Sequence, residues 1–358
     1  MSRKIIFSFA TIVLYQSTFL FAPLEKPEKE LKKEWFKVIN DVVKQKEAVD
    51  TLSIKTLILQ GADINWQQDD DYGKTALHKA IESDNKEVID FLLKQKPDIL
   101  IQDKQKVTPF HMAATLGNTE LVKEMLDNFN IDPDTKGVDN NTALLLATKS
   151  GKLETVKLLL QYDVNPFAKS TLGISPISFI TNQIEKYKKN EMDTTALENI
   201  HRALENKVTA IKQSLLQQMN STPPDLKKIE KLISHLDDLN FADESGNTPL
   251  HFAAKNNLTE MVKTIINKQA LVNMKNYKLE TPLYDAVSNE NKEIVDLIIK
   301  SDAEIEPGDR VILQGRIGTK IAQEKKIIAQ KKKKKEKADT VRLKKLEQIK
   351  SLLSAQTR

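Results

Sequence analysis

A six-residue pattern recurs along the chain at a nearly fixed spacing, and it constrains the fold more than any other feature. It begins with Thr or Ser, continues with Pro or Ala and an apolar residue, and ends in most copies with Ala. The copies begin at Thr75, Thr108, Thr142, Ser175, Thr248 and Thr281. Successive starts are 33, 34, 33, 73 and 33 residues apart. A fixed period of this length indicates stacked repeats, each contacting only its neighbours.

Each copy of the pattern predicts the start of a short helix. The Thr or Ser oxygen can cap the free N–H groups of the first turn, and Pro suits the next position because its missing N–H costs nothing there. The helix should end nine residues later, at Asp84, Gly117, Gly151, Asn257 and Glu290. Gly, Asn and Asp tolerate the left-handed backbone of a helix end. We expect Asn289 or Asn291 to adopt that conformation in place of Glu290.

A second helix is predicted in each copy by two pairs of apolar residues one turn apart. In the first copy these are Val88, Ile89, Leu92 and Leu93. Such spacing gives one apolar face on a helix. Because a single repeat cannot bury that face, neighbouring repeats must stack.

The motif Thr248-Pro249-Leu250-His251-Phe252-Ala253, its copies and the 33-residue period resemble the ankyrin repeat. The resemblance implies an all-α solenoid of stacked helix-turn-helix units with β-hairpin loops, to which a helical C-terminal tail is added here. It also implies a non-enzymatic scaffold for protein–protein interaction. Ankyrin arrays behind an export signal resemble host-interacting proteins of intracellular bacteria.

Three histidines hold the fourth position of their motifs, and the resemblance implies that they tie the loop backbone together through hydrogen bonds. Leu145 and Tyr284 hold the same position in other copies, which argues against a metal site. The residues with a structural role in the repeat are Thr75, His78, Thr108, His111, Gly117, Thr142, Gly151, Thr248, His251 and Thr281.

Period and composition divide the chain into seven predicted parts. They are a signal peptide or N-terminal anchor (1–24), a linker (25–33), an N-terminal ankyrin block of a cap repeat and four repeats, the last degenerate (34–181), an irregular helical insertion (182–224), a C-terminal ankyrin block (225–306), a C-terminal cap (307–324) and a Lys-rich helical tail (325–358). The cap repeat lacks the motif, as expected where one side faces water.

An uncharged apolar run from Ile5 to Leu24 follows Ser2-Arg3-Lys4 at the N-terminus. A basic segment followed by an apolar one predicts a secretory signal. Its 20 residues would also span a bilayer as an uncleaved anchor. We favour the cleaved signal and keep the anchor as the alternative. The predicted location is therefore secreted, periplasmic or membrane-tethered through residues 5–24.

Several chemistries find no support in the sequence. The absence of cysteine excludes disulfides, thiolate zinc sites and cysteine nucleophiles. A phosphate-binding GxxxxGK[ST] loop is absent too, and no spacing is typical of a nucleophile–base pair or a metal cluster. We predict no enzymatic activity, no cofactor, no metal and no small-molecule substrate, and we expect a monomer.

The C-terminal segment is strongly basic. Residues 310–358 contain 16 Lys and Arg against 4 Asp and Glu, a net charge of +12, whereas the remainder carries −7. The unbroken run consists of Lys331, Lys332, Lys333, Lys334 and Lys335. A solvated helical tail is the main interpretation, and a coiled coil has fewer than three clean heptads to support it. The alternative is an adaptor whose tail docks on anionic membrane or nucleic acid while the repeats bind a protein partner.

The resemblance implies that a protein partner of unknown identity lies across the hairpin tips and the concave face of the first helices. The candidate contacts, carried over position by position, are Tyr72, Lys79, Lys104, Met112, Asp139, Leu146, Lys149, Phe252, Lys255 and Tyr277. Because exposed apolar patches often mark partner sites, we expect Met112 and Leu146 to form an apolar strip and Phe252 a second spot. Packing against the preceding hairpin is the alternative.

Overall fold

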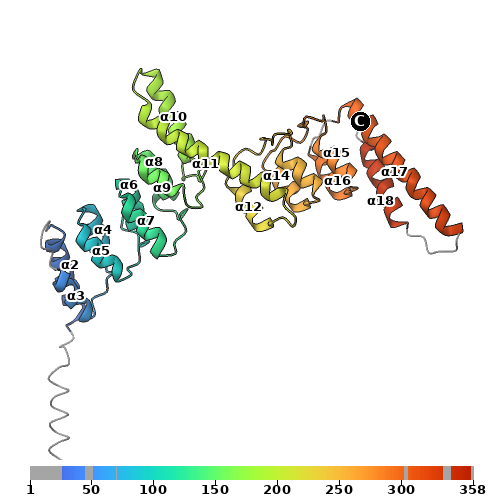
Figure 1. Ribbon diagram of the computed structural model, residues 1–358. Coiled ribbons are helices and arrows are strands. Elements are labelled where there is room, and N and C mark those ends of the chain that lie inside the picture. Colours follow the sequence, from blue (N-terminus) through green and yellow to red (C-terminus); the bar gives the residue numbers. More distant parts are fainter. Residues whose placement is uncertain (1–25, 45–50, 70, 302–304, 334–339, 356–358) are drawn as a thin grey trace, which may run out of the picture. The chain divides into compact units, whose positions relative to one another are not determined.

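The computed structural model describes residues 26–44, 51–69, 71–301, 305–333 and 340–355. These residues form helices joined by turns, and no strand occurs among them (Figure 1). The predicted β-hairpin loops are tight turns, and two of them hold an isolated antiparallel bridge, Gln68–Lys74 and Lys136–Thr142. The prediction of an all-α array of helix pairs is confirmed.

Two compact units make up the described residues, and the boundary between them falls inside helix α11, after Ala203. Asn165–Phe167 belong with the second unit. The first unit contains α2 (Glu28–Val42), α3 (Thr51–Leu59), α4 (Ala76–Glu82), α5 (Lys86–Lys94), α6 (Pro109–Leu116), α7 (Thr119–Asn128), the short turn η1 (Val138–Asn140), α8 (Ala143–Lys149), α9 (Leu153–Leu159), α10 (Pro176–Lys189) and the start of α11 (Thr195–Met219). We call α2, α4, α6, α8 and α10 the inner helices and their partners the outer helices.

The motif residues start the inner helices as the sequence predicts. The hydroxyl oxygens of Thr75, Thr108 and Thr142 accept the backbone N–H three residues later, and Ser175 does the same for α10. Such a cap stabilises a helix by about 1 kcal/mol. Inner helices then pack in series, with α2 against α4, α4 against α6, α6 against α8 and α8 against α10. The apolar pairs of the outer helices, such as Val88 and Leu92, are fully buried.

The N-terminal linker predicted over residues 25–33 is wrong, because α2 begins at Glu28. Leu31 is buried and lies on the same face as Trp35 and Ile39, so this segment is needed to cover the next repeat. The predicted signal or anchor, residues 1–24, lies outside the described residues.

The second unit continues from Leu204 in α11. Its other helices are α12 (Leu226–Ser234), α13 (Pro249–Lys255), α14 (Thr259–Asn267), α15 (Pro282–Ser288), α16 (Lys292–Lys300), α17 (Pro307–Lys333) and α18 (Val341–Ala355). Thr248 and Thr281 cap α13 and α15. Inner helix α13 packs against α15, and outer helix α14 packs against α16.

The helical insertion predicted over residues 182–224 forms the extension of α10 and the whole of α11, with residues 190–194 between the two helices. The end of α11 holds the place of an inner helix. Asn256 Nδ2 donates to the Met219 carbonyl at 2.8 Å. One repeat later, Asn289 Nδ2 makes the equivalent contact with the end of α13, at the carbonyl of Lys255. The long step of 73 residues therefore hides a repeat whose inner helix is fused to the helix before it.

The C-terminal segment forms a helical hairpin that packs against the last repeat. The predictions of a boundary at residue 325 and of a solvated tail are therefore wrong. Helix α17 runs across that boundary and packs against α15, while α18 folds back against α16 and α17. Leu346, Ile349 and Leu353 are fully buried, because their spacing puts them on one face of α18. The hairpin closes the array in the place of a further repeat.

The prediction that Asn289 or Asn291 adopts the left-handed backbone in place of Glu290 is also wrong. Glu290 adopts the left-handed backbone itself, with φ +58°, as do Asp84, Gly117, Gly151 and Asn257 at the equivalent helix ends. The Glu290 carboxylate accepts from Lys320 at 2.9 Å and from Arg342 at 2.8 Å. The hydrogen bond from Arg342 is the main cause that lowers the pKa of Glu290 to about 2. Ion pairs with the C-terminal hairpin thus hold a residue type that is uncommon in this conformation.

Replacing Leu346 by Ala should destabilise the second unit by about 2–4 kcal/mol, because the change opens a cavity between α18 and its neighbours. Urea unfolding of the full chain, followed by circular dichroism, measures the effect. The matched control is the exposed neighbour Lys345→Ala, which should change stability by less than about 0.5 kcal/mol. Equal stability of both variants would contradict the packing of α18.

Candidate functional site

Backbone hydrogen bonds connect the hairpin tips of neighbouring repeats in three pairs, two in the first unit and one in the second. The N–H of Lys104 donates to the Tyr72 carbonyl at 2.7 Å, and the N–H of Thr171 donates to the Asp139 carbonyl at 2.7 Å. In the second unit Tyr277 N–H donates to the Ser245 carbonyl at 3.0 Å. In all three pairs the acceptor stands three residues before one motif and the donor four residues before the next. These bonds hold the tips of neighbouring repeats in fixed register.

The residue two positions before each motif takes a left-handed backbone at every tip. These residues are Gly73, Lys106, Asn140, Gly173, Gly246 and Leu279, with φ between +58° and +81°. Gly and Asn adopt this conformation easily, whereas Lys106 and Leu279 do so with strain. At Gly246 a Cβ atom would stand 2.9 Å from the backbone N of Tyr277, so only glycine fits there.

Large apolar side chains are exposed at these tips. Tyr72 is 60% exposed, Leu172 78%, Tyr277 79% and Leu279 73%. The two tyrosines were predicted as contacts from the sequence, whereas Leu172 and Leu279 were not. Leu172 directly precedes the left-handed residue of its tip, and Leu279 is the left-handed residue itself. A side chain at either position points out of the turn, and this position in the motif could have predicted their exposure. Tyrosines on rigid turns are typical of protein interfaces.

The three motif histidines link each inner helix to the next hairpin. His78 Nδ1 lies 2.8 Å from the Thr75 hydroxyl, and His78 Nε2 lies 3.1 Å from the Val107 carbonyl. His111 and His251 place Nε2 at 3.0 Å from the carbonyls of Thr135 and Glu280. Burial lowers the pKa of all three imidazoles, so the neutral form, with Nε2–H donating to the carbonyl, is favoured.

Met112 and Leu146, the apolar strip predicted in the first unit, are half-buried, so the strip stays a prediction. Met112 and Leu146 lie at the same place in successive repeats, beside the exposed Lys149. Lys79 does not belong to this surface, since it is buried and donates to Asn40 Oδ1 at 2.7 Å and to the Asp71 carboxylate. Its ammonium is therefore a structural tie to α2.

Phe252 is not an exposed spot in the second unit, because only 7% of the residue is accessible. The preceding inner element there is the end of the long helix α11, to which α13 is bonded through Asn256 and Met219. Lys255, one turn further along α13, is exposed. The remaining predicted contacts, Lys104 and Asp139, are exposed at the tips.

Asp285 holds the equivalent concave position in the last repeat and differs from the others. Its carboxylate is half-buried and has no side-chain hydrogen bond or ion pair with the described residues. Burial, followed by repulsion from Glu280, raises the pKa of Asp285 to about 6, although Lys255, Arg316 and Lys278 act in the opposite sense. A carboxylate kept without a partner in this way marks a candidate contact for a donor.

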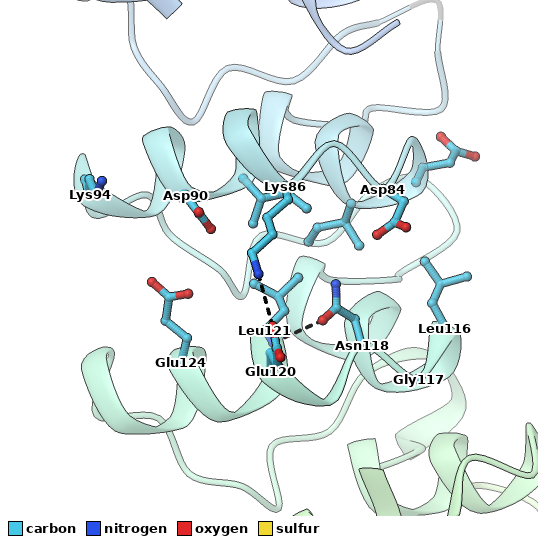
Figure 2. A pocket seen from close by; sticks show the side chains of 13 residues that line it. Asp84, Lys86, Asp90, Lys94, Leu116, Gly117, Asn118, Glu120, Leu121 and Glu124 are labelled. Carbon is cyan, nitrogen blue, oxygen red and sulfur yellow. Dashed lines mark hydrogen bonds and ion pairs between the residues drawn. The ribbon is translucent and has the colours of Figure 1, made fainter. Parts of the chain in front are cut away.

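A hollow in the first unit lies between two neighbouring repeats, along α5, α7 and the turns that precede them. It encloses about 800 Å³, and Ile81, Ile89, Leu116 and Leu121 form its apolar part. Figure 2 shows acidic side chains around it and one ion pair across it, from Lys86 Nζ to Glu120 at 3.1 Å. Exposed pairs of this kind contribute about 0–1 kcal/mol. We assign no ligand to this hollow.

The described residues offer no site for a metal, since no group of three or more His, Asp or Glu side chains among them is placed to hold one. Within the same residues no helix is both long and apolar enough to cross a membrane. Lys331, Lys332 and Lys333 form the last turn of α17, whereas Lys334 and Lys335 lie outside the described residues. A role of this basic run in membrane or nucleic-acid contact stays a prediction.

Paired helices in series, capped Thr motifs and hydrogen-bonded tips define a class of stacked repeat proteins. The family model for ankyrin repeats matches three segments of the chain, residues 43–103, 95–170 and 200–309, which together exceed half of its length. The chain belongs to the ankyrin repeat family. Ankyrin repeats are in general non-enzymatic modules for protein–protein interaction.

Curated relatives share the repeats but not the whole architecture. An ankyrin repeat protein of Rickettsia felis is 26% identical over 254 residues, which cover 63% of each chain. The human transient receptor potential cation channel subfamily A member 1 is 32% identical over 108 residues, or 30% of this chain and 10% of the channel. Dog inversin is 28% identical over 237 residues, or 64% of this chain and 18% of inversin. The matched segments span less than two thirds of each relative.

Replacing Asp285 by Asn should stabilise the protein at pH 7.5 by about 1 kcal/mol, allowing for solvent screening. The raised pKa means that the native state binds this proton more tightly than the unfolded chain, so native stability falls as pH rises from 4 through 6. Asn does not ionise, and the difference between variant and parent should vanish near pH 4. Urea unfolding at both pH values measures it. A difference of equal size at the two values would contradict the assignment.

Proposed function

We propose that this protein is a scaffold that grips another protein across the hairpin tips and the concave face of its ankyrin array. The observation that carries the proposal is the set of exposed tyrosine and leucine side chains on hydrogen-bonded tips. Holding them in fixed register in the free protein reduces the entropy lost on binding. In the free protein these apolar side chains lie in water. A partner that covers them removes apolar surface from water, which favours binding.

In the first unit the proposed contact surface combines the tips with the half-buried strip of Met112 and Leu146. Lys149, one turn after Leu146 on α8, is exposed and donates to Asn141 Oδ1 at 2.9 Å. An apolar centre with a polar rim is the usual organisation of a protein interface. This arrangement supports protein recognition better than catalysis, since no cluster of acid, base and nucleophile accompanies it among the described residues.

Replacing Tyr72 and Leu172 together by Ser should reduce capture of the protein's partners by at least about tenfold, because both tips lose their apolar contacts. Affinity capture from the native cells, quantified by mass spectrometry against the parent protein, measures the loss. The melting temperature should not change, since both side chains are exposed.

The matched control replaces Leu52 and Leu59, which are equally exposed but lie on α3 away from the tips. This variant should capture partners as the parent does. Recovery of the same partners at full yield by the tip variant would overturn the proposed surface.

We propose further that the array acts after export, either as a released protein or tethered by residues 5–24. The support is the sequence alone, a basic start followed by an uncharged apolar run.

Sequencing the N-terminus of the mature protein, together with its cellular fraction, tests the export proposal. Cleavage after the apolar run, with the protein in the medium or periplasm, is the expected result for a signal peptide. An intact N-terminus in the membrane fraction indicates the anchor. An intact N-terminus in the cytosol would contradict both.

A further inference from the structure

The row of tips in the second unit ends without a partner. One period after the last hairpin, Lys275–Glu280, stand residues 308–313, and these are helical and belong to α17. Among the residues that the structure describes, no hairpin therefore follows the last one. In the three bonded pairs, the acceptor is the carbonyl three residues before the motif, which in the last repeat is that of Lys278. No backbone N–H of the described residues donates to it, which is also true of the equivalent Gln105 carbonyl inside the first unit.

The histidine contact that links three of the inner helices to the next hairpin is also missing in the last repeat. His251 contacts the carbonyl of Glu280 in the following hairpin. In the last repeat Tyr284 holds the histidine position, and its hydroxyl accepts from Arg316 of α17, whose guanidinium lies 4.5 Å from the centre of the tyrosine ring. Helix α17 thus supplies the side-chain packing of a further repeat but not the backbone hydrogen bond that a further hairpin would donate.

A cavity of about 380 Å³ lies between the last hairpin and the first turns of α17. Leu279, Tyr284, Ile312 and Leu313 form its apolar part, and the polar part consists of Lys275, Lys278, Glu280, Thr281 and Asp309. Lys278 makes no ion pair with the described residues. The neighbouring Lys275 is already paired with Glu306 at 2.7 Å and Asp309 at 3.1 Å.

The backbone and exposure of Leu279 indicate independently that the last hairpin tip is not optimised for stability. Leu279 is exposed and holds a left-handed backbone with φ +61°, although Gly occupies the same position in three other tips. A large side chain held under strain and left in water is typical of a contact residue.

We infer that the open end of the tip row binds an extended segment of a partner protein, which takes the place of the missing hairpin. The segment donates one backbone N–H to the Lys278 carbonyl, as Tyr277 donates to Ser245, and inserts an apolar side chain into the cavity. An acidic residue beside it pairs with the ammonium of Lys278. Addition of an extended chain to an unpaired backbone edge is a known recognition mode.

The occupant is a polypeptide because the edge offers a carbonyl in a fixed direction next to a small apolar cavity. Backbone N–H groups beside alternating side chains fit that pair of features. The inference rests on the proposed role as a protein-binding scaffold, but it uses a surface in the second unit that is different from the tips of Tyr72 and Leu172.

The test uses a phage-displayed library of linear dodecapeptides, selected against the full chain, and fluorescence anisotropy of the selected peptides. Ile312→Asp and Leu279→Asp should each weaken binding by at least about tenfold. Both side chains are exposed, so the variants should melt as the parent does. The control Val311→Asp lies on the same helix, is 70% exposed and does not line the cavity, and it should bind normally.

A second measurement distinguishes recognition of the peptide backbone from non-specific binding. Methylation of the backbone nitrogens of a selected peptide, one at a time, should abolish binding at one position. The Tyr72 and Leu172 variant should bind the peptides normally, so a failure of this inference is distinct from a failure of the proposed contact surface. Three results would overturn the inference: no selected peptide, equal binding to Ile312→Asp, or self-association of the parent that Ile312→Asp abolishes.

Discussion

Burial of apolar helix faces between neighbouring repeats is the interaction on which this protein depends. Each outer helix carries one apolar face, and residues such as Val88, Val156 and Val295 reach full burial only because another helix pair lies against them. The same requirement explains both ends. Helix α2 at one end and the α17–α18 hairpin at the other cover faces that a motif repeat would otherwise cover. Stability is therefore a property of pairs of repeats rather than of any single one.

A second layer of order lies at the tips, where backbone hydrogen bonds connect hairpins and the motif side chains connect helices to hairpins. This layer uses polar groups that must be paired wherever they are buried, and the three histidines meet that need. The tips can then hold exposed tyrosines in place without a core beneath them. Strain is concentrated here too, at Lys106 and Leu279. The hydrogen bonds that make the tips rigid therefore also hold the side chains that we propose as partner contacts.

The period and the motif sufficed to predict the fold class, the capped inner helices and the buried faces of the outer helices, because each follows from local residue order. The sequence was less informative where tertiary contacts decide. The spacing of Leu346, Ile349 and Leu353 was visible, but the face that covers them comes from α16 and α17. Phe252 and Lys79 fill positions that point outward in an average repeat, and an atypical neighbouring helix covers each. The exposed tyrosines were predictable from the turn, whereas the desolvated carboxylate of Asp285 was not.

The two kinds of tie between elements respond to acid in a definite order. The histidine ties depend on neutral imidazole with lowered pKa values, so they lose their contribution as pH falls below the ordinary histidine range. Glu290 keeps its charge down to about pH 2, and its contacts with Lys320 and Arg342 last correspondingly longer. On acidification the array should loosen first along its length, between hairpins and helices. The ion pairs of Glu290 with the C-terminal hairpin should weaken only at lower pH.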